Sequence, residues 1–313
     1  AALELWIREV RLRRLLGVDR ELAAFDRVGQ RLRDLNATQE LQLLAVRMDG
    51  IEPTLDIDLA ADRTRLENIA NIYATVGDVE AAAALRQRLA DQALAAGNQT
   101  EHQTQLEILA SLYADWFYFD QAAEIYRDLA QLAQAEATLE DEIRFLRPHI
   151  DNLEQAQRFE DALTAQQRLL TLYSSTETLW PLVPELQHRI AQNQRNLGDL
   201  DTASRQYQAA YTNAISSLQF DVAAEAIRAL ASLYRQLERW PDVGYLYQQL
   251  LLVEREAINA YGLMDTFDQL GQFYEQAGDP ERALLAYREG LILARQLGHR
   301  QAYFEEQINR LTG

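Results

Sequence analysis

Few side chains in this sequence could carry chemistry. Cysteine and lysine are both absent, since all 30 basic residues are arginine, which excludes thiolate nucleophiles, cysteine-ligated zinc and Schiff-base lysines. None of the four histidines stands at metal-ligand spacing with a second histidine or a set of carboxylates; they are His102, His149, His188 and His299. We therefore expect neither a metal site nor a cofactor.

The motifs of common active sites are also missing. The sequence contains no glycine-rich phosphate loop, no G-x-S-x-G elbow and no dinucleotide-binding fingerprint. Its acidic residues are scattered through helical patterns, where carboxylates more often face solvent or pair with arginine than form catalytic pairs. The sequence therefore predicts a protein that is not an enzyme.

Composition and charge narrow the function further. The 48 acidic residues against 30 basic ones give a net charge of −18, which argues against general binding to nucleic acids or anionic membranes. No run of apolar residues is long enough to insert into a membrane. Both the cytosol and an oxidising space suit a chain without cysteine. We slightly favour the cytoplasm, and a periplasmic or lumenal site stays open if the N-terminus is processed. The lysine-free, glutamine- and arginine-rich composition resembles that of bacterial repeat proteins.

A pattern of small and large residues recurs about every forty residues. It appears as Ile69, Ala70, Tyr73 and Ala82, as Leu109, Ala110, Tyr113, Ala122 and Tyr126, and as Leu270, Gly271, Tyr274, Ala283 and Tyr287. Apolar residues three and four apart predict two helices in each unit. Pairs such as Gly77-Asp78 and Gly198-Asp199 separate them, because glycine ends one helix and aspartate caps the next.

This pattern resembles the tetratricopeptide repeat. The residues that match it position for position are Phe267, Leu270, Gly271, Tyr274, Ala283 and Tyr287, and Gly290 replaces the last alanine. A forty-residue unit resembles the cell-polarity adaptor and bacterial peptide-sensing subclasses. The resemblance implies an all-α fold, an α-solenoid of antiparallel helix pairs in a right-handed superhelix.

The register predicts one solenoid over residues 1–313. Residues 1–17 would be the second helix of an incomplete unit or a cap, and 18–57 a degenerate unit. Residues 58–300 would hold about six units, and 301–313 a C-terminal capping helix. A start within a repeat favours a piece of a longer protein over a lone capping helix. We expect the first helix to pack on the next through Leu5, Leu12 and Leu16.

In the family, the concave face is lined by first-helix positions outside the packing pattern. The matching positions here are basic in the middle units, at Arg144, Arg147, His188, Arg195, Arg228 and Arg235. They are acidic in the flanking units, at Glu67, Glu107, Asp268 and Glu275. Because arginine can hold a carboxylate through two nitrogens, the middle units predict an acidic or carboxylate-bearing partner.

A purely structural role for these arginines stays open and is slightly favoured. Glu225 precedes Arg228 by three residues, and Glu140 precedes Arg144 by four, which are spacings that stabilise a helix without a ligand. A second candidate contact patch is the run Trp116, Phe117, Tyr118 and Phe119. Four consecutive aromatic residues at a turn cannot all face inward, so we expect one or two to protrude.

The sequence thus predicts a non-catalytic scaffold that binds a peptide or helix of a partner protein in a concave groove, in the manner of a complex-assembly factor. Two alternatives remain. The chain could be the peptide-sensing regulatory module of a larger protein, or an accessory module of a multidomain enzyme.

Overall fold

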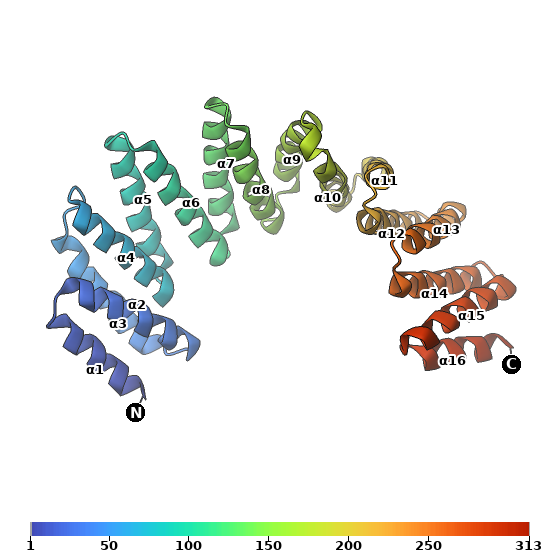
Figure 1. Ribbon diagram of the computed structural model, residues 1–313, viewed down its shortest axis with the longest axis horizontal. Helices are drawn as coiled ribbons and strands as arrows, with labels where there is room; N and C mark the ends of the chain where they lie inside the picture. Colours follow the sequence, from blue (N-terminus) through green and yellow to red (C-terminus); the bar gives the residue numbers. More distant parts are fainter. Residues whose placement is uncertain (1, 313) are drawn as a thin grey trace. The chain divides into compact units, whose positions relative to one another are not determined.

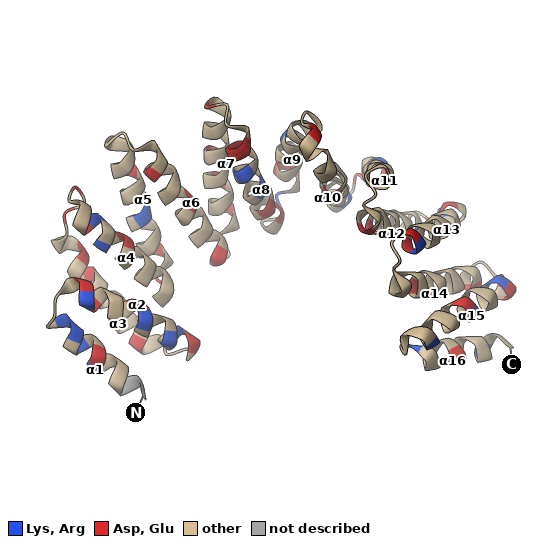
Figure 2. Cartoon of the chain, in the orientation of Figure 1, with Lys and Arg blue, Asp and Glu red and all other residues tan. Residues whose placement is uncertain are grey.

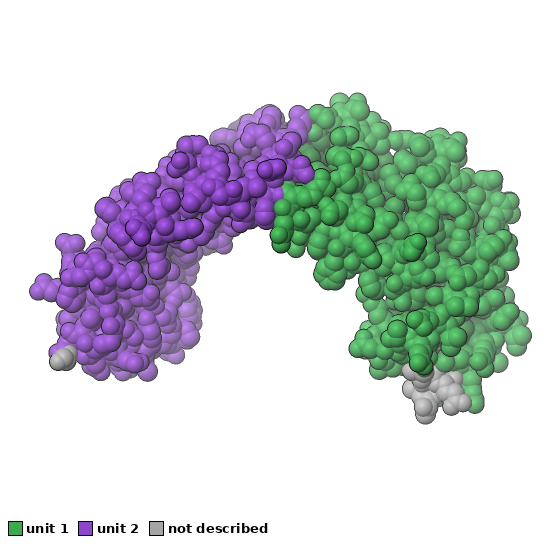
Figure 3. Space-filling model, turned by 180° about the vertical axis from the view of Figure 1, so that it is seen from behind, with its two compact units in different colours: residues 1–158 green, residues 159–313 purple. Residues whose placement is uncertain are grey.

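The chain is helical from end to end in the computed structural model, which describes the backbone of residues 2–312 and the side chains of residues 5–312. These residues form sixteen α-helices and two short 3₁₀ helices, with no strand, which confirms the predicted all-α fold (Figure 1). Residues 1 and 313, the ends of the predicted solenoid, lie outside the described part. The chain divides into two compact units, residues 1–158 and 159–313 (Figure 3).

The first unit contains α1 (Ala2–Arg14), α2 (Val18–Asp34), α3 (Thr38–Ile51), η1 (Glu52–Thr54), α4 (Ala60–Val76), α5 (Val79–Ala95), α6 (Gln99–Asp115), α7 (Phe119–Ala135) and α8 (Leu139–Gln155). The second contains α9 (Phe159–Ser174), η2 (Glu177–Leu182), α10 (Val183–Asn196), α11 (Leu200–Ser216), α12 (Phe220–Gln236), α13 (Trp240–Glu256), α14 (Ala260–Gln276), α15 (Pro280–Leu297) and α16 (Gln301–Thr312). Short turns make successive helices antiparallel neighbours within each unit. We call α4, α6, α8, α10, α12 and α14 the first helices.

Three of the turns use the glycine–aspartate chemistry that the sequence indicates. Gly77, Gly198 and Gly278 have φ angles of 88°, 82° and 74°, in the left-handed region that glycine enters without a steric penalty. The aspartate that follows each glycine caps the next helix; for example, the Asp78 side chain accepts the Ala81 backbone N–H at 3.1 Å. Sharp, capped turns let helices of about equal length stack side by side.

The repeated small and large residues form the core, as expected. The small residues of the pattern are fully buried at Ala82, Ala122, Ala162, Ala203 and Ala283. The aromatic residues Tyr73, Tyr207 and Tyr287 are buried between them. At Gly271 a Cβ atom would lie only 2.4 Å from the Tyr287 ring, so this position must be glycine for α14 and α15 to pack this closely.

The predicted contact face of α1 was wrong. Leu5, Leu12 and Leu16 are 62%, 65% and 67% exposed, whereas Trp6 and Val10 belong to the core of the first unit. At about 100° per residue, the leucine stripe lies about 120° around the helix from Trp6 and Val10. A helix this short carries two apolar stripes, and the sequence alone does not say which one packs.

Candidate functional site

Side chains at the predicted groove positions form a connected row in the second unit. Arg195 on α10 donates from Nη2 to the Ser232 hydroxyl on α12 at 3.4 Å. On α14, Asp268 accepts the Tyr303 hydroxyl of α16 at 2.7 Å. The first contact links the first helices α10 and α12, and the second links α14 to α16.

The first unit contains an equivalent row. Gln105 on α6 donates to Glu67 on α4 at 3.3 Å, and Arg144 on α8 donates to Glu107 on α6 at 3.2 Å. Behind it, the buried Arg86 side chain donates to Gln105 Oε1 at 2.6 Å. Burial lowers the pKa of Arg86 and raises the pKa of Glu67, although each charge opposes the other's shift. This part of the row is therefore cross-linked by its own polar groups.

Arg144 and Arg228, both predicted groove arginines, form internal ion pairs. Arg144 pairs with Glu107, and also with Asp141 at 3.7 Å, rather than with Glu140. Arg228 pairs with Glu254, a buried residue of the second helix α13, rather than with Glu225. Burial raises the pKa of Glu254, and the charge of Arg228 opposes this rise. These two arginines therefore have the purely structural role that the sequence left open.

His188 does not add a positive charge to the row. Its half-buried ring lies 5.3 Å from the Tyr207 ring, centre to centre, and burial lowers the pKa of the imidazole. Its Nε2 atom is buried without a hydrogen-bond partner in the described part of the chain. The imidazole is therefore neutral near pH 7, and the expected basic character of this position was overestimated because the sequence does not show its burial.

Arg195 and Arg235 are different. They occupy the same register position on the neighbouring helices α10 and α12, and neither forms an ion pair with any residue that the structure describes. Arg235 is exposed, and Arg195 is half-buried beside Ser232. These two cations, with the Ser232 hydroxyl between their helices, make up what we call the arginine pair site.

The remaining groove residue, Arg147, is exposed on α8 in the first unit, as is Arg144. The other four predicted residues, His188, Arg195, Arg228 and Arg235, belong to the second unit. A single channel shared by Arg147 and these residues stays a prediction.

The aromatic run at the turn between α6 and α7 divides as expected. Phe117 and Tyr118 are 79% and 46% exposed, and Phe119 is half-buried. The Trp116 ring lies over Gly77, where a Cβ would come within 3.2 Å of it, and the Arg33 guanidinium lies 5.1 Å from the ring centre. Thus two residues protrude, Phe117 and Tyr118, while Trp116 closes the turn beside α4.

Sequence reasoning missed Glu254, the buried partner of Arg228. The available signal was its helical register, because an acid in the middle of an apolar stripe needs a partner cation. The described residues contain no cluster of three or more histidine or carboxylate groups that could hold a metal ion. None of the described helices is both long and apolar enough to span a membrane.

Known proteins share both a sequence motif and the fold with this chain. A family model of the tetratricopeptide repeat matches residues 266–301, within α14 and through α15. No curated protein sequence matches the chain. The fold is similar to that of PH0952 from Pyrococcus horikoshii, a signal transduction ATPase with a tetratricopeptide repeat sensor. That likeness has 14% identity and a TM-score of 0.53, and it covers 99% of this chain and 50% of that one.

The fold is also similar to that of the apo form of RapI. The identity is 10% and the TM-score 0.52, over 99% of this chain and 96% of that one. At these identities the likeness establishes the fold alone. The chain therefore contains a match to the tetratricopeptide repeat at residues 266–301, and its fold of antiparallel helix pairs is similar to that of a protein with a tetratricopeptide repeat sensor.

Proposed function

We propose that this protein is a non-catalytic interaction module that binds an acidic or carboxylate-bearing peptide at the arginine pair site. The observation that carries the proposal is that Arg195 and Arg235 lack a carboxylate partner. They stand on adjacent first helices without an ion-pair partner in the described part of the chain, in a protein with a net charge of −18. Other charges of the row, such as Arg144, Arg228 and Glu275, are paired.

The chemistry of the site suits a carboxylate. Each guanidinium can offer two parallel N–H donors to one carboxylate, and the Ser232 hydroxyl adds a third donor group. A hydrogen bond to a charged group contributes about 1.5–3 kcal/mol when water is excluded. An exposed ion pair contributes about 0–1 kcal/mol. Arg195, which is half-buried, is therefore expected to contribute more than Arg235.

A second candidate function is the sensor module of a longer protein. The fold of PH0952, which carries a tetratricopeptide repeat sensor, supports this candidate, and this chain spans half of that protein's length. The two candidates share the same peptide site and differ in what the bound peptide does. A complex-assembly scaffold holds its partner, whereas a sensor passes the binding event to another domain.

The test is selection from a random peptide library with free C-terminal carboxylates. Wild-type protein is compared with Arg195→Gln/Arg235→Gln and with the control Arg255→Gln/Arg288→Gln, whose exposed arginines lie on α13 and α15. We expect wild type and control to enrich the same acidic peptides and the groove variant to lose them. Enrichment of the same peptides by all three folded proteins would refute the proposal.

A further inference from the structure

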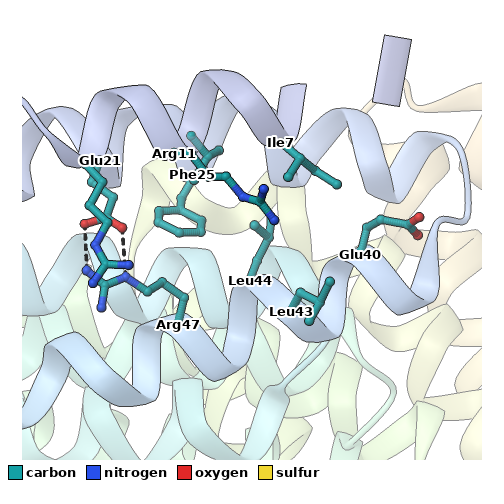
Figure 4. Close-up of a pocket in the computed structure, with 10 residues that line it drawn as sticks. Ile7, Arg11, Glu21, Phe25, Glu40, Leu43, Leu44 and Arg47 are labelled. Carbon is teal, nitrogen blue, oxygen red and sulfur yellow. Dashed lines mark hydrogen bonds and ion pairs between the residues drawn. The ribbon is translucent and has the colours of Figure 1, made fainter. Parts of the chain in front are cut away.

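A groove lies on α2 between α1 and α3 in the first unit, away from the row of first-helix side chains. It encloses a cavity of about 200 Å³. Its floor includes Phe25 of α2, and its walls include Ile7 and Val10 of α1 and Leu44 of α3. Figure 4 shows Ile7 and Arg11 on one side and Leu43 and Leu44 on the other, with the groove between them.

Both walls follow the spacing of a helix that packs against another helix. The α1 wall consists of residues 7, 10, 11 and 14, and the α3 wall of residues 40, 43, 44 and 47. Each set has the i, i+3, i+4, i+7 pattern of one helical face. Because α1 and α3 each direct a complete face into the groove, the groove has the shape in which a further helix would pack.

In the first unit, α2 packs directly on α4 as well as on α3. Gly29 of α2 permits this contact, since a Cβ there would lie 3.3 Å from Thr75 of α4 and 3.8 Å from Leu44. The apolar wall residue Leu43 is left 65% exposed. Leu43 therefore adds exposed apolar surface to the wall of the cavity.

The charges of the groove are unequal on its two walls. Glu21 is neutralised by Arg47, which donates to its two carboxylate oxygens at 2.8 and 3.0 Å (Figure 4). Arg11 and Arg14 on the α1 wall are exposed, and neither forms an ion pair with any residue the structure describes. Figure 2 shows the basic residues of α1, which carries four arginines and two glutamates in a chain of net charge −18.

We propose that this groove docks an amphipathic helix of a partner protein, with its apolar face on Phe25, Leu43 and Leu44 and its acidic residues along Arg11 and Arg14. Leu43 supplies the apolar surface to be buried, since Phe25 and Leu44 are already only 1% and 6% exposed. The two unpaired arginines set the orientation by charge complementarity. Glu40 on the opposite wall disfavours an acidic group on that side. It also disfavours an anionic membrane surface, as does the net charge of the chain.

The probe is a designed helical peptide of about 18 residues, long enough for one apolar face of four turns. It carries leucines at i, i+3, i+4 and i+7 and glutamates along one flank; the comparison peptide has glutamine in place of glutamate. Fluorescence anisotropy measures both with the full chain. We expect Arg11→Glu/Arg14→Glu to weaken binding of the acidic peptide about tenfold, because the change removes two exposed attractions and adds two repulsions.

Leu43→Ser tests the apolar wall at an exposed position where the fold tolerates a polar side chain, and it is expected to weaken both peptides equally. The control Arg255→Glu/Arg288→Glu makes the same charge change on the second unit and should bind like wild type. Equal affinity of the folded Arg11→Glu/Arg14→Glu variant for the acidic peptide would overturn the proposal.

Two further measurements distinguish a partner helix from two other occupants of the groove, a membrane surface and a second copy of the chain. Arginine-dependent binding to vesicles of phosphatidylglycerol and phosphatidylcholine, without peptide binding, would assign the groove to a membrane and overturn the proposal. Self-association in sedimentation velocity that Arg11→Glu/Arg14→Glu abolishes would assign it to a second copy of the chain, with the same consequence. Since the arginine pair site is unchanged in these variants, failure here leaves the proposed function standing.

Discussion

Arg195 Nη2 lies 3.4 Å from the Ser232 hydroxyl, a contact that joins α10 to α12 at neighbouring groove positions. Repeat register alone predicted Arg195 as a groove residue. The contact shows that α10 and α12 bring these two side chains together in the second unit. It also leaves Arg195 without a carboxylate partner in the described part of the chain, since serine cannot neutralise it.

The pair Arg228–Glu254 gives a prediction for stability. Replacing Arg228 with Gln leaves the carboxylate of Glu254 buried without its cation. Breaking a buried pair costs about 3–5 kcal/mol, and the partial exposure of Arg228 reduces this to about 2 kcal/mol. Hydrogen exchange of α12 and α13 amides should report the loss. Arg228→Gln/Glu254→Gln should recover most of it, and no recovery would contradict the pairing.

Two glycines should respond to alanine with opposite signs. At Gly290 a Cβ would lie 2.3 Å from the buried Phe304 ring, so Gly290→Ala is expected to destabilise α15 by about 1–2 kcal/mol despite its better helix propensity. At Gly50 the nearest atom is 3.8 Å away, so Gly50→Ala should stabilise α3 by up to about 1 kcal/mol. Local hydrogen exchange measures both, and equal signs would refute the packing argument.

Ile258 occupies a left-handed turn between α13 and α14, with φ at 55° and 90% of the side chain exposed. A β-branched residue is strained there and gains almost no burial in return. Ile258→Gly should therefore raise the thermal unfolding temperature, with a gain of about 1 kcal/mol. A lower unfolding temperature would contradict this prediction, because it would show that the Ile258 side chain makes stabilising contacts despite its exposure.

The buried His149 predicts a dependence of stability on pH. Burial lowers its pKa in the folded state below the ordinary value of 6.5, although Nδ1 lies 2.9 Å from the Ala123 carbonyl oxygen. The unfolded chain therefore takes up the proton first. Its contribution to stability is complete above about pH 6.5 and decreases as the pH falls below that value, by at most about 1.4 kcal/mol per pH unit.

The contribution of His149 is isolated by measuring the free energy of unfolding of wild type and of His149→Gln over about two pH units, from pH 7.5 to 5.5. The raised pKa of Glu254 acts in the opposite direction, giving stability at low pH that is lost as the pH rises through its folded value. That contribution is common to both proteins and cancels in the difference. A difference that does not change with pH would show that His149 titrates normally.

Sequence patterns predicted what depends on local chemistry. Gly77-Asp78 and similar pairs predicted the turns that they occupy, whereas other turns place a non-glycine residue such as Ile258 at positive φ. The buried tyrosines and alanines followed the repeat. The contact face of α1 could not be predicted, because the stripe with Leu5 and the stripe with Val10 are both apolar. Packing against α2 decided between them.

The candidate site was predictable only in part for the same reason. Register placed Arg195, Arg228 and Arg235 in one row, but their charge state depends on neighbours distant in sequence. Arg228 meets Glu254 from the adjoining helix, and burial, which has no signature in the sequence, makes His188 neutral. Only the folded chain shows which arginines remain without a carboxylate.

The most direct test of the arginine pair site is the affinity of its selected acidic peptide for wild-type protein and for Arg195→Gln/Arg235→Gln, measured by titration calorimetry. Removal of two charge-assisted contacts predicts a loss of at least about tenfold for the groove variant, with Arg255→Gln/Arg288→Gln unchanged. The affinity should also fall as salt is raised. Equal affinities of the three folded proteins would contradict the account.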